Sequence, residues 1–121
     1  RAWDKGSKRM GRVVAIDWDD EQIISVHIEF PNGDVEKFYP HETAGDQIVF
    51  LQYTGLKDIN GKEIYEGDII SDPMGIGQIV FDSGSFCIKW NDNPNESILI
   101  LESELLEIIG NLFETPELLK V

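Results

Sequence analysis

The sequence is poor in cysteine, in positive charge and in long apolar segments. A single cysteine among 121 residues excludes an intrachain disulfide framework and zinc sites built from several cysteines. No apolar run approaches the roughly 20 residues that cross a bilayer, so we expect no membrane partner. Ten lysines and arginines stand against 23 aspartates and glutamates, which gives a net charge of −13. Because DNA binding relies on cations that neutralise phosphates, this balance disfavours a nucleic-acid partner.

The few positive charges gather at the start of the chain. Five of the ten basic residues lie within residues 1–12, beside a single acid, Asp4. We favour a solvated turn that keeps a strand edge from aggregating. The alternative is a basic N-terminal arm that makes the protein a nucleic-acid-binding barrel. For the acidic remainder, the alternatives to plain solubility are attraction to a protein with a basic surface and mimicry of nucleic acid that inhibits a DNA-binding protein.

Two features favour a reducing cytoplasm. No segment has the basic start, apolar centre and small-residue cleavage site of a secretory signal. The free thiol also suits that compartment. The first residue is Arg1 rather than methionine, so we expect further residues to precede it.

Alternation of apolar and polar residues, bounded by turn residues, dominates the sequence, and helical periodicity is nearly absent. The pattern predicts a mainly β fold with one or two short helical turns. The expected strands lie at residues 12–16, 48–53, 69–70, 97–101 and 107–113, with an acidic turn at 17–21 and helical turns at 102–106 and after Thr115.

A first hairpin is expected around Asn32 and Gly33, a dipeptide that tolerates positive φ. A two-residue turn there pairs Phe30 with Val35 and collects most apolar side chains on one face. The same register places Glu29 opposite Glu36, and like charges in that position cost a few tenths of a kcal/mol or more.

A second hairpin, at residues 77–90, has the clearest local pattern. With Ser83 and Gly84 as the turn, six mostly apolar residues fall on one face and mostly polar residues on the other. We therefore expect one face to lie on a core and the other to be largely wet. The six residues are Gly77, Ile79, Phe81, Phe86, Ile88 and Trp90.

Four consecutive apolar residues at 48–51 predict burial on both faces or contact between two lobes. The glycines at positions 55 and 61 make residues 54–62 the best candidate for a boundary between two regions of the chain. We predict an N-terminal β region over residues 1–54 and a C-terminal region over 55–121, sharing a core.

Few residues could carry out chemistry. His27 lies in an alternating strand and His41 in a polar connection, and neither has a partner at metal-ligand spacing. Cys87 falls opposite Val80, which indicates a small packed thiol rather than a nucleophile.

The abundant carboxylates do not form a recognisable site. Asp17, Asp19 and Asp20 would hold a hard cation only if their oxygens converge. The segment 58–61 resembles part of a calcium loop, but it lacks the further acid and the closing glutamate, so a tight turn explains it better. Residues 75–78 lack the third glycine of a phosphate loop. A hydrolase with paired carboxylates stays an alternative, but we expect no catalytic residue, no metal site and no cofactor.

Aromatic residues are the remaining candidates for a binding surface. Tyr53 and Tyr65 flank the glycine-rich segment and could form an exposed pair, with core packing as the alternative. We take Tyr53, Lys57, Tyr65 and Glu66 as the candidate interaction surface. The other aromatic residues weighed were Trp3, Trp18, Phe86 and Trp90, the last two being assigned to the core.

Residues 1–4, 52–58, 60–69 and 109–111, together with Glu114 and residues 116–118, resemble the YopX family. This is a group of small proteins encoded by bacteriophages and prophages. The resemblance does not rest on any motif within residues 11–50. The resemblance implies an N-terminal β-hairpin region followed by a small SH3-like barrel, in the cytoplasm of a bacterial host. It implies no catalytic residue, because the family has no established activity to carry over.

We therefore expect a non-enzymatic protein that acts through protein–protein contact and self-associates. Small β lobes with strand edges and a doubly apolar segment gain stability by pairing or packing with copies of themselves. A homo-oligomer and a host protein with a basic surface are the expected partners.

Overall fold

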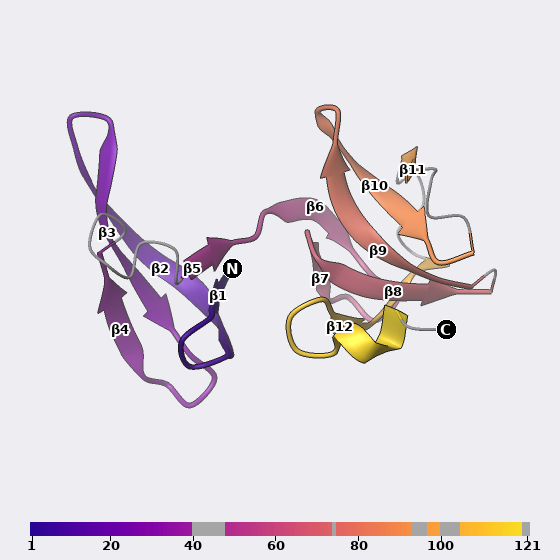
Figure 1. The fold of residues 1–121 in the computed structure, drawn as a ribbon, viewed down its shortest axis with the longest axis horizontal. Coiled ribbons are helices and arrows are strands. Elements are labelled where there is room, and N and C mark those ends of the chain that lie inside the picture. Colours follow the sequence, from indigo (N-terminus) through magenta and orange to yellow (C-terminus); the bar gives the residue numbers. More distant parts are fainter. Residues whose placement is uncertain (40–47, 74, 93–96, 100–104, 120–121) are drawn as a thin grey trace. The chain divides into compact units, whose positions relative to one another are not determined.

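The computed structural model describes residues 1–39, 48–73, 75–92, 97–99 and 105–119, the segment 97–99 by its backbone alone. Strands dominate these ranges, which confirms the mainly β class. The chain forms two compact units, Arg1–Leu51 and Gln52–Val121 (Figure 1). The sequence placed the boundary three residues later, after residue 54. None of the described helices is long and apolar enough to cross a membrane.

Unit 1 is built on one antiparallel sheet with the strand order β4-β3-β2-β1-β5. Alternating apolar side chains from several strands meet on one face, where Ala2, Val26, Ile28 and Phe30 are buried. The strands are β1 (Ala2–Asp4), β2 (Arg9–Asp19), β3 (Gln22–Glu29), β4 (Val35–Phe38) and β5 (Ile48–Phe50).

The predicted strand at 12–16 is the middle of the longer β2. The acidic turn contains only Asp20 and Glu21, whose φ angles of 46° and 71° give the left-handed pair that suits a two-residue hairpin turn. Asp17, Trp18 and Asp19 therefore belong to the strand, and the prediction of a turn over residues 17–21 was too long.

The predicted register of the first hairpin is wrong by one residue. Val26 lies opposite Phe38, and Glu29 lies opposite Val35. The reason is a three-residue turn: Phe30 N donates to Asp34 O at 2.8 Å, and Gly33 N donates to Phe30 O at 2.9 Å. A proline at position 31 fixes its own φ, and a glycine with φ of 91° ends the turn.

The corrected register removes the expected repulsion between Glu29 and Glu36. Arg12 Nη2 lies 2.8 Å from Glu29 Oε1, and Arg9 forms an ion pair with Glu36. The solvated turn expected in the basic segment lies at residues 5–8, where it joins β1 to β2. β1 covers β2 only as far as Gly11.

Unit 2 combines a five-stranded antiparallel sheet, ordered β11-β10-β9-β8-β12, with a two-stranded sheet of β6 and β7. This arrangement is consistent with the SH3-like barrel that the family resemblance implies. Its core contains Ile64, Ile70, Ile79, Ile88 and Leu106. The elements are β6 (Tyr53–Lys57), β7 (Glu63–Tyr65), β8 (Asp68–Asp72), β9 (Gly75–Asp82), β10 (Ser85–Trp90), β11 (Ser97–Leu99), β12 (Glu107–Asn111) and the 3₁₀ helix η2 (Pro116–Leu119).

The β9–β10 hairpin confirms the predicted register. Phe81 lies opposite Phe86, Ile79 opposite Ile88, and Gly77 opposite Trp90. A Cβ at position 77 would lie 2.9 Å from Ile88 Cγ2 and 3.1 Å from Trp90 Cε3, so glycine leaves room for the indole. Burial departs from the expectation at Phe81, which is 48% exposed.

The predicted strand at 48–53 is two strands, because β5 ends at Phe50 and β6 begins at Tyr53. Leu51 N donates to Arg1 O in unit 1, whereas Gln52 O accepts from Glu66 N in unit 2. Burial on both faces does not extend along the whole apolar run, because Phe50 is 45% exposed.

The last predicted strand, 107–113, ends at Asn111. There the side-chain Oδ1 accepts hydrogen bonds from Phe113 N and Glu114 N and so closes a turn. The short helix after Thr115 is confirmed as η2. The Thr115 hydroxyl, just before that helix, accepts a hydrogen bond from Asn111 N at 3.0 Å. His41 and most of the predicted helical turn at 102–106 lie outside the described residues.

Candidate interaction surface

The β6–β7 hairpin brings three of the four candidate residues onto one face. Tyr53 lies directly opposite Tyr65, and Lys57 lies opposite Glu63. Between these two pairs the chain advances by four residues along β6 but by only two along β7, so β6 contains a β-bulge. Gly55 lies in this bulge with a φ of 86°. Because side chains alternate along a strand, Glu63 and Tyr65 share this face while the residue between them points to the core.

The two tyrosines form a cross-strand aromatic pair. Their ring centroids are 5.4 Å apart at an interplanar angle of 39°. Tyr53 is 41% exposed, which confirms an exposed position for this ring, while Tyr65 is half-buried. The Tyr65 hydroxyl donates to Glu63 Oε2 at 2.8 Å, which fixes the direction of its ring. Ile64 anchors the strand from behind, since its side chain is fully buried.

Lys57 and Glu66 hold different positions around this pair. Lys57 is exposed at the bulged end of the face, opposite Glu63. Glu66 lies in the turn after β7, where its N–H donates to Gln52 O at 2.9 Å. Sequence reasoning missed Glu63, although its position two residues before Tyr65 would have placed it on the same face. We call Tyr53, Lys57, Glu63 and Tyr65 the tyrosine face.

A buried carboxylate, that of Asp58, stabilises the turn between β6 and β7. Asp58 Oδ1 accepts hydrogen bonds from Asn60 N and Lys62 N, both at 2.9 Å, and Oδ2 accepts from Ile108 N at 3.0 Å. Burial opposes its ionisation, but these N–H donors and the Lys62 ammonium outweigh burial and hold the pKa of Asp58 below its ordinary 3.8. Segment 58–61 is therefore the tight turn that the sequence indicated, with both carboxylate oxygens occupied.

Comparison with known proteins gives the chain its relatives. A model of the family described as YopX protein matches residues 1–120. The chain belongs to the YopX family. It is also similar to protein EF1440 from Enterococcus faecalis, known from a crystal structure, with 28% identity over 99% of this chain and 96% of that one, and a TM-score of 0.61. No curated protein matches it significantly.

This YopX-family protein also has a serine, a histidine and an aspartate together on β2 and β3. The Ser25 hydroxyl donates to Asp17 Oδ2 at 2.5 Å, and His27 Nε2 lies 3.2 Å from the same oxygen. The bond from Ser25, followed by that from His27, lowers the pKa of Asp17. A nucleophilic serine needs the imidazole against its hydroxyl. Here the carboxylate takes that place, so the cluster does not have the order of a hydrolytic triad.

The remaining candidate residues do not converge. Across the described ranges, no group of three histidine, cysteine or acidic side chains is placed to hold a metal ion. Asp19 and Asp20 lie at the end of β2 and in its turn, apart from the Asp17 cluster. Cys87 is a buried free thiol whose Sγ lies 3.8 Å from the Ser85 hydroxyl, as expected for a packed cysteine.

A second exposed surface of the YopX-family chain was not predicted. It lies on the part of the β2–β3 hairpin that pairs with neither β1 nor β4. Trp18 is 60% exposed there, and Ile16 and Ile24 are about as exposed as Tyr53. Alternation alone indicates that one face of such a strand is apolar, but it does not tell whether that face is covered.

Proposed function

We propose that this protein has no enzymatic activity, acts through protein–protein contact and self-associates through the tyrosine face. The single observation that supports the proposal most is the Tyr53–Tyr65 pair, in which Tyr53 is exposed and Tyr65 half-buried. Tyrosine is enriched at protein interfaces, because it offers a large and rather rigid contact area with a polar end. A ring held in place before binding loses less conformational entropy when the contact forms.

The charges on the tyrosine face suit a second copy of the same chain. One lysine and one glutamate flank the two rings, so the face is locally neutral although the whole chain carries −13. In a two-fold contact, Lys57 of one copy can meet Glu63 of the other, and the reciprocal contact forms by symmetry. This arrangement avoids the repulsion that other acidic surfaces of the chain would create.

The proposal of a non-enzymatic role draws support from the way polar groups are used. The Asp58 carboxylate is occupied by backbone donors, and the Cys87 thiol is packed. The family assignment and the free thiol support a role in the cytoplasm of a bacterium that carries a phage or prophage.

Light scattering and sedimentation between about 1 and 100 µM test the proposal. We expect the wild-type mass to rise with concentration, and the double variant Tyr53→Ser/Tyr65→Ser to stay monomeric. Removing two interface anchors of about 2 kcal/mol each costs about 4 kcal/mol and weakens association by about 1,000-fold. Ile59→Ser is the matched control, because Ile59 is 61% exposed in the same unit but lies outside the tyrosine face. A wild type that stays monomeric at 100 µM would contradict self-association.

The two nucleic-acid alternatives have less support. Asp4, Asp58 and Asp68 are buried, so their carboxylates are not displayed as phosphate mimics. Two of the arginines in the basic segment are ion-paired within the sheet, which reduces the charge available for phosphate. A shift assay at low salt tests direct binding where its electrostatic contribution is strongest.

A further inference from the structure

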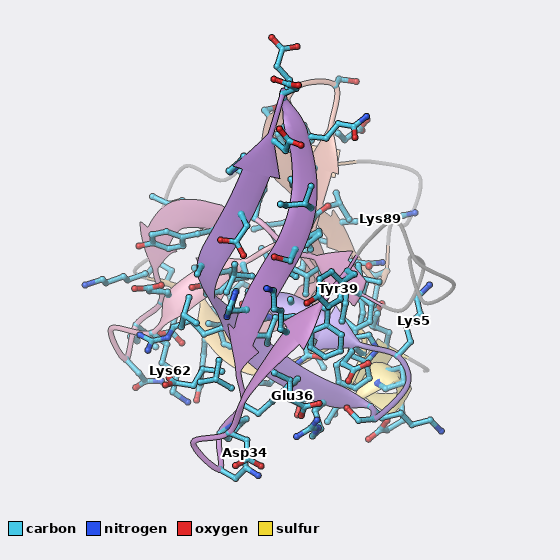
Figure 2. All side chains as sticks on the ribbon, turned by 90° about the vertical axis from the view of Figure 1, so that its left-hand side faces the viewer. Lys5, Asp34, Glu36, Tyr39, Lys62 and Lys89 are labelled. Carbon is cyan, nitrogen blue, oxygen red and sulfur yellow. The ribbon has the colours of Figure 1, made fainter. Side chains whose placement is uncertain are left out.

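The outer part of the β2–β3 hairpin extends beyond its neighbours. β1 pairs with β2 only as far as Gly11, and β4 pairs with β3 only from Val26 onward. Among the described strands, residues 14–25 therefore pair only within the β2–β3 hairpin, and we call this segment the finger. Figure 2 shows it reaching away from the turn that holds Asp34. A two-stranded hairpin alone is marginally stable in water, so its faces gain from cover.

One face of the finger continues the core outward. Ile16 lies opposite Val26, a fully buried core residue, and Trp18 lies opposite Ile23 with a bulge between the two pairs. Ile24 is the extra residue of β3 at this bulge, and Ile23 beside it packs against the core of unit 1. Ile16, Trp18 and Ile24 are 40%, 60% and 44% exposed. Three large apolar side chains within this short hairpin, each about half open to water, form a patch rather than scattered singles.

Trp18 contributes the largest share of this patch. If a tryptophan offers up to about 250 Å², an exposed fraction of 60% leaves on the order of 150 Å² in contact with water. Tryptophan is also the residue most enriched among those that dominate binding energies. The two isoleucines beside it supply the apolar surroundings that exclude water from such a contact.

The charge around the patch decides what covers it. Asp17, Asp19, Asp20 and Glu21 belong to the finger, and no lysine or arginine occurs between residues 13 and 36. A second finger would bring eight acids together, whereas a lysine or arginine would be attracted by the four acids of one finger, of which Asp20 and Glu21 form the turn next to the end of the strand that holds Trp18. Such a cation also gains from the face of an indole, the ring that attracts cations best. The occupant that fits is a basic segment with apolar side chains.

We propose that the finger is a docking element for a protein segment in which apolar residues alternate with lysine or arginine, with Trp18 as its anchor. This inference deepens the proposed function, on which it rests, by assigning the basic partner to unit 1. It leaves the locally neutral tyrosine face to self-association. The two surfaces therefore differ in the charge that they select.

The test uses a defined probe, a synthetic eight-residue peptide of alternating leucine and lysine, and maps backbone amide shifts of the full chain by NMR. We expect the largest shifts in residues 14–25 and no binding of the leucine–glutamate counterpart. Trp18→Ser should weaken binding at least tenfold, while Ile59→Ser leaves it unchanged. Asp19→Asn/Glu21→Gln should weaken it more at low salt than at high salt. Glu107→Gln/Glu117→Gln, with the same change in charge elsewhere, should have little effect.

Three outcomes would overturn the inference. The first is shifts spread over all acidic surfaces, and the second is peptide binding that survives Trp18→Ser in a variant whose amide spectrum is otherwise native. The third is a fall in the mass of the peptide-free protein on Trp18→Ser, which would mean that a second copy covers the finger. Loss of association in the tyrosine-face variant concerns the proposed function alone, so the two failures are distinguishable.

Discussion

Replacing Asp58 by alanine tests the structural account of unit 2 most directly. The carboxylate accepts three backbone N–H groups, two from its own turn and one from Ile108, fifty residues further along the chain. The substitution leaves all three donors without their partner. It therefore loosens the turn and its attachment to β12 together.

The expected loss of stability is about 3 kcal/mol. Hydrogen bonds to a charged acceptor contribute about 1.5–3 kcal/mol each, but water can replace the carboxylate at the exposed Asn60 and Lys62. We therefore assign about 1 kcal/mol to each of these two bonds and about 2 to Ile108 N, less about 1 for removing a buried charge. For a unit of this size the loss corresponds to a fall in Tm of about 12–24 °C.

The effect should depend on pH in one direction. The pKa of Asp58 is lower in the folded protein than its ordinary 3.8, so the folded state favours the ionised carboxylate. Its stabilisation is fully present above 3.8 and is lost as the pH falls through the lower folded value. The difference in stability between wild type and Asp58→Ala should therefore be constant at neutral pH and shrink below pH 3.8.

Urea unfolding followed by NMR amide signals measures the stability of each unit separately. Asp82→Ala is the matched control, since Asp82 is exposed at the end of the β9–β10 hairpin, and it should change stability by less than about 0.5 kcal/mol. A loss below about 1 kcal/mol for Asp58→Ala at pH 7, or a difference from wild type that persists unchanged at pH 2, would refute the reasoning.

Three further predictions concern packing, charge and reactivity. Gly77→Ala should destabilise unit 2 by about 1–3 kcal/mol in urea unfolding, because the new Cβ would crowd Ile88 and Trp90; a neutral effect would show that the hairpin can shift. A double-mutant cycle on Arg12 and Glu29 should give a coupling below about 1 kcal/mol, since 72% of the arginine side chain is exposed; a larger value would contradict a weak surface pair. Cys87 should react with a thiol reagent only as fast as unit 2 opens, because it is buried; immediate labelling in the native state would contradict this.

The two hairpins show what the sequence could and could not determine. At residues 77–90 the turn dipeptide and the apolar alternation favour the same register, so the prediction was confirmed. At residues 22–38 alternation is compatible with both a two-residue and a three-residue turn. Pro31 and the bond from Phe30 N to Asp34 O select the longer one. A change of one residue in a turn moves the whole partner strand, and local composition did not reveal it.

The candidate surfaces were predictable to different degrees. The tyrosine pair could be proposed because both rings flank a glycine-rich segment, although Tyr65 is only half-exposed. The place of Glu63 opposite Lys57 depends on a bulge in β6. The finger could not be foreseen. Its exposure follows from the shortness of β1 and β4, which pair with only three and four residues of their neighbours. That is a property of the assembled sheet.

The bond between Asp58 and Ile108 also affects the order in which the protein can fold during synthesis. The five strands that the structure describes in unit 1 lie within the first 50 residues, so this sheet can form once residue 51 has left the ribosome. Unit 2 cannot complete its sheet before β12 has been synthesised, because β12 pairs with β8 and its Ile108 N–H donates to the Asp58 carboxylate. Domains fold as units from the N-terminus during synthesis. A nascent chain that stops before residue 107 therefore carries a complete first unit and a second one that cannot close.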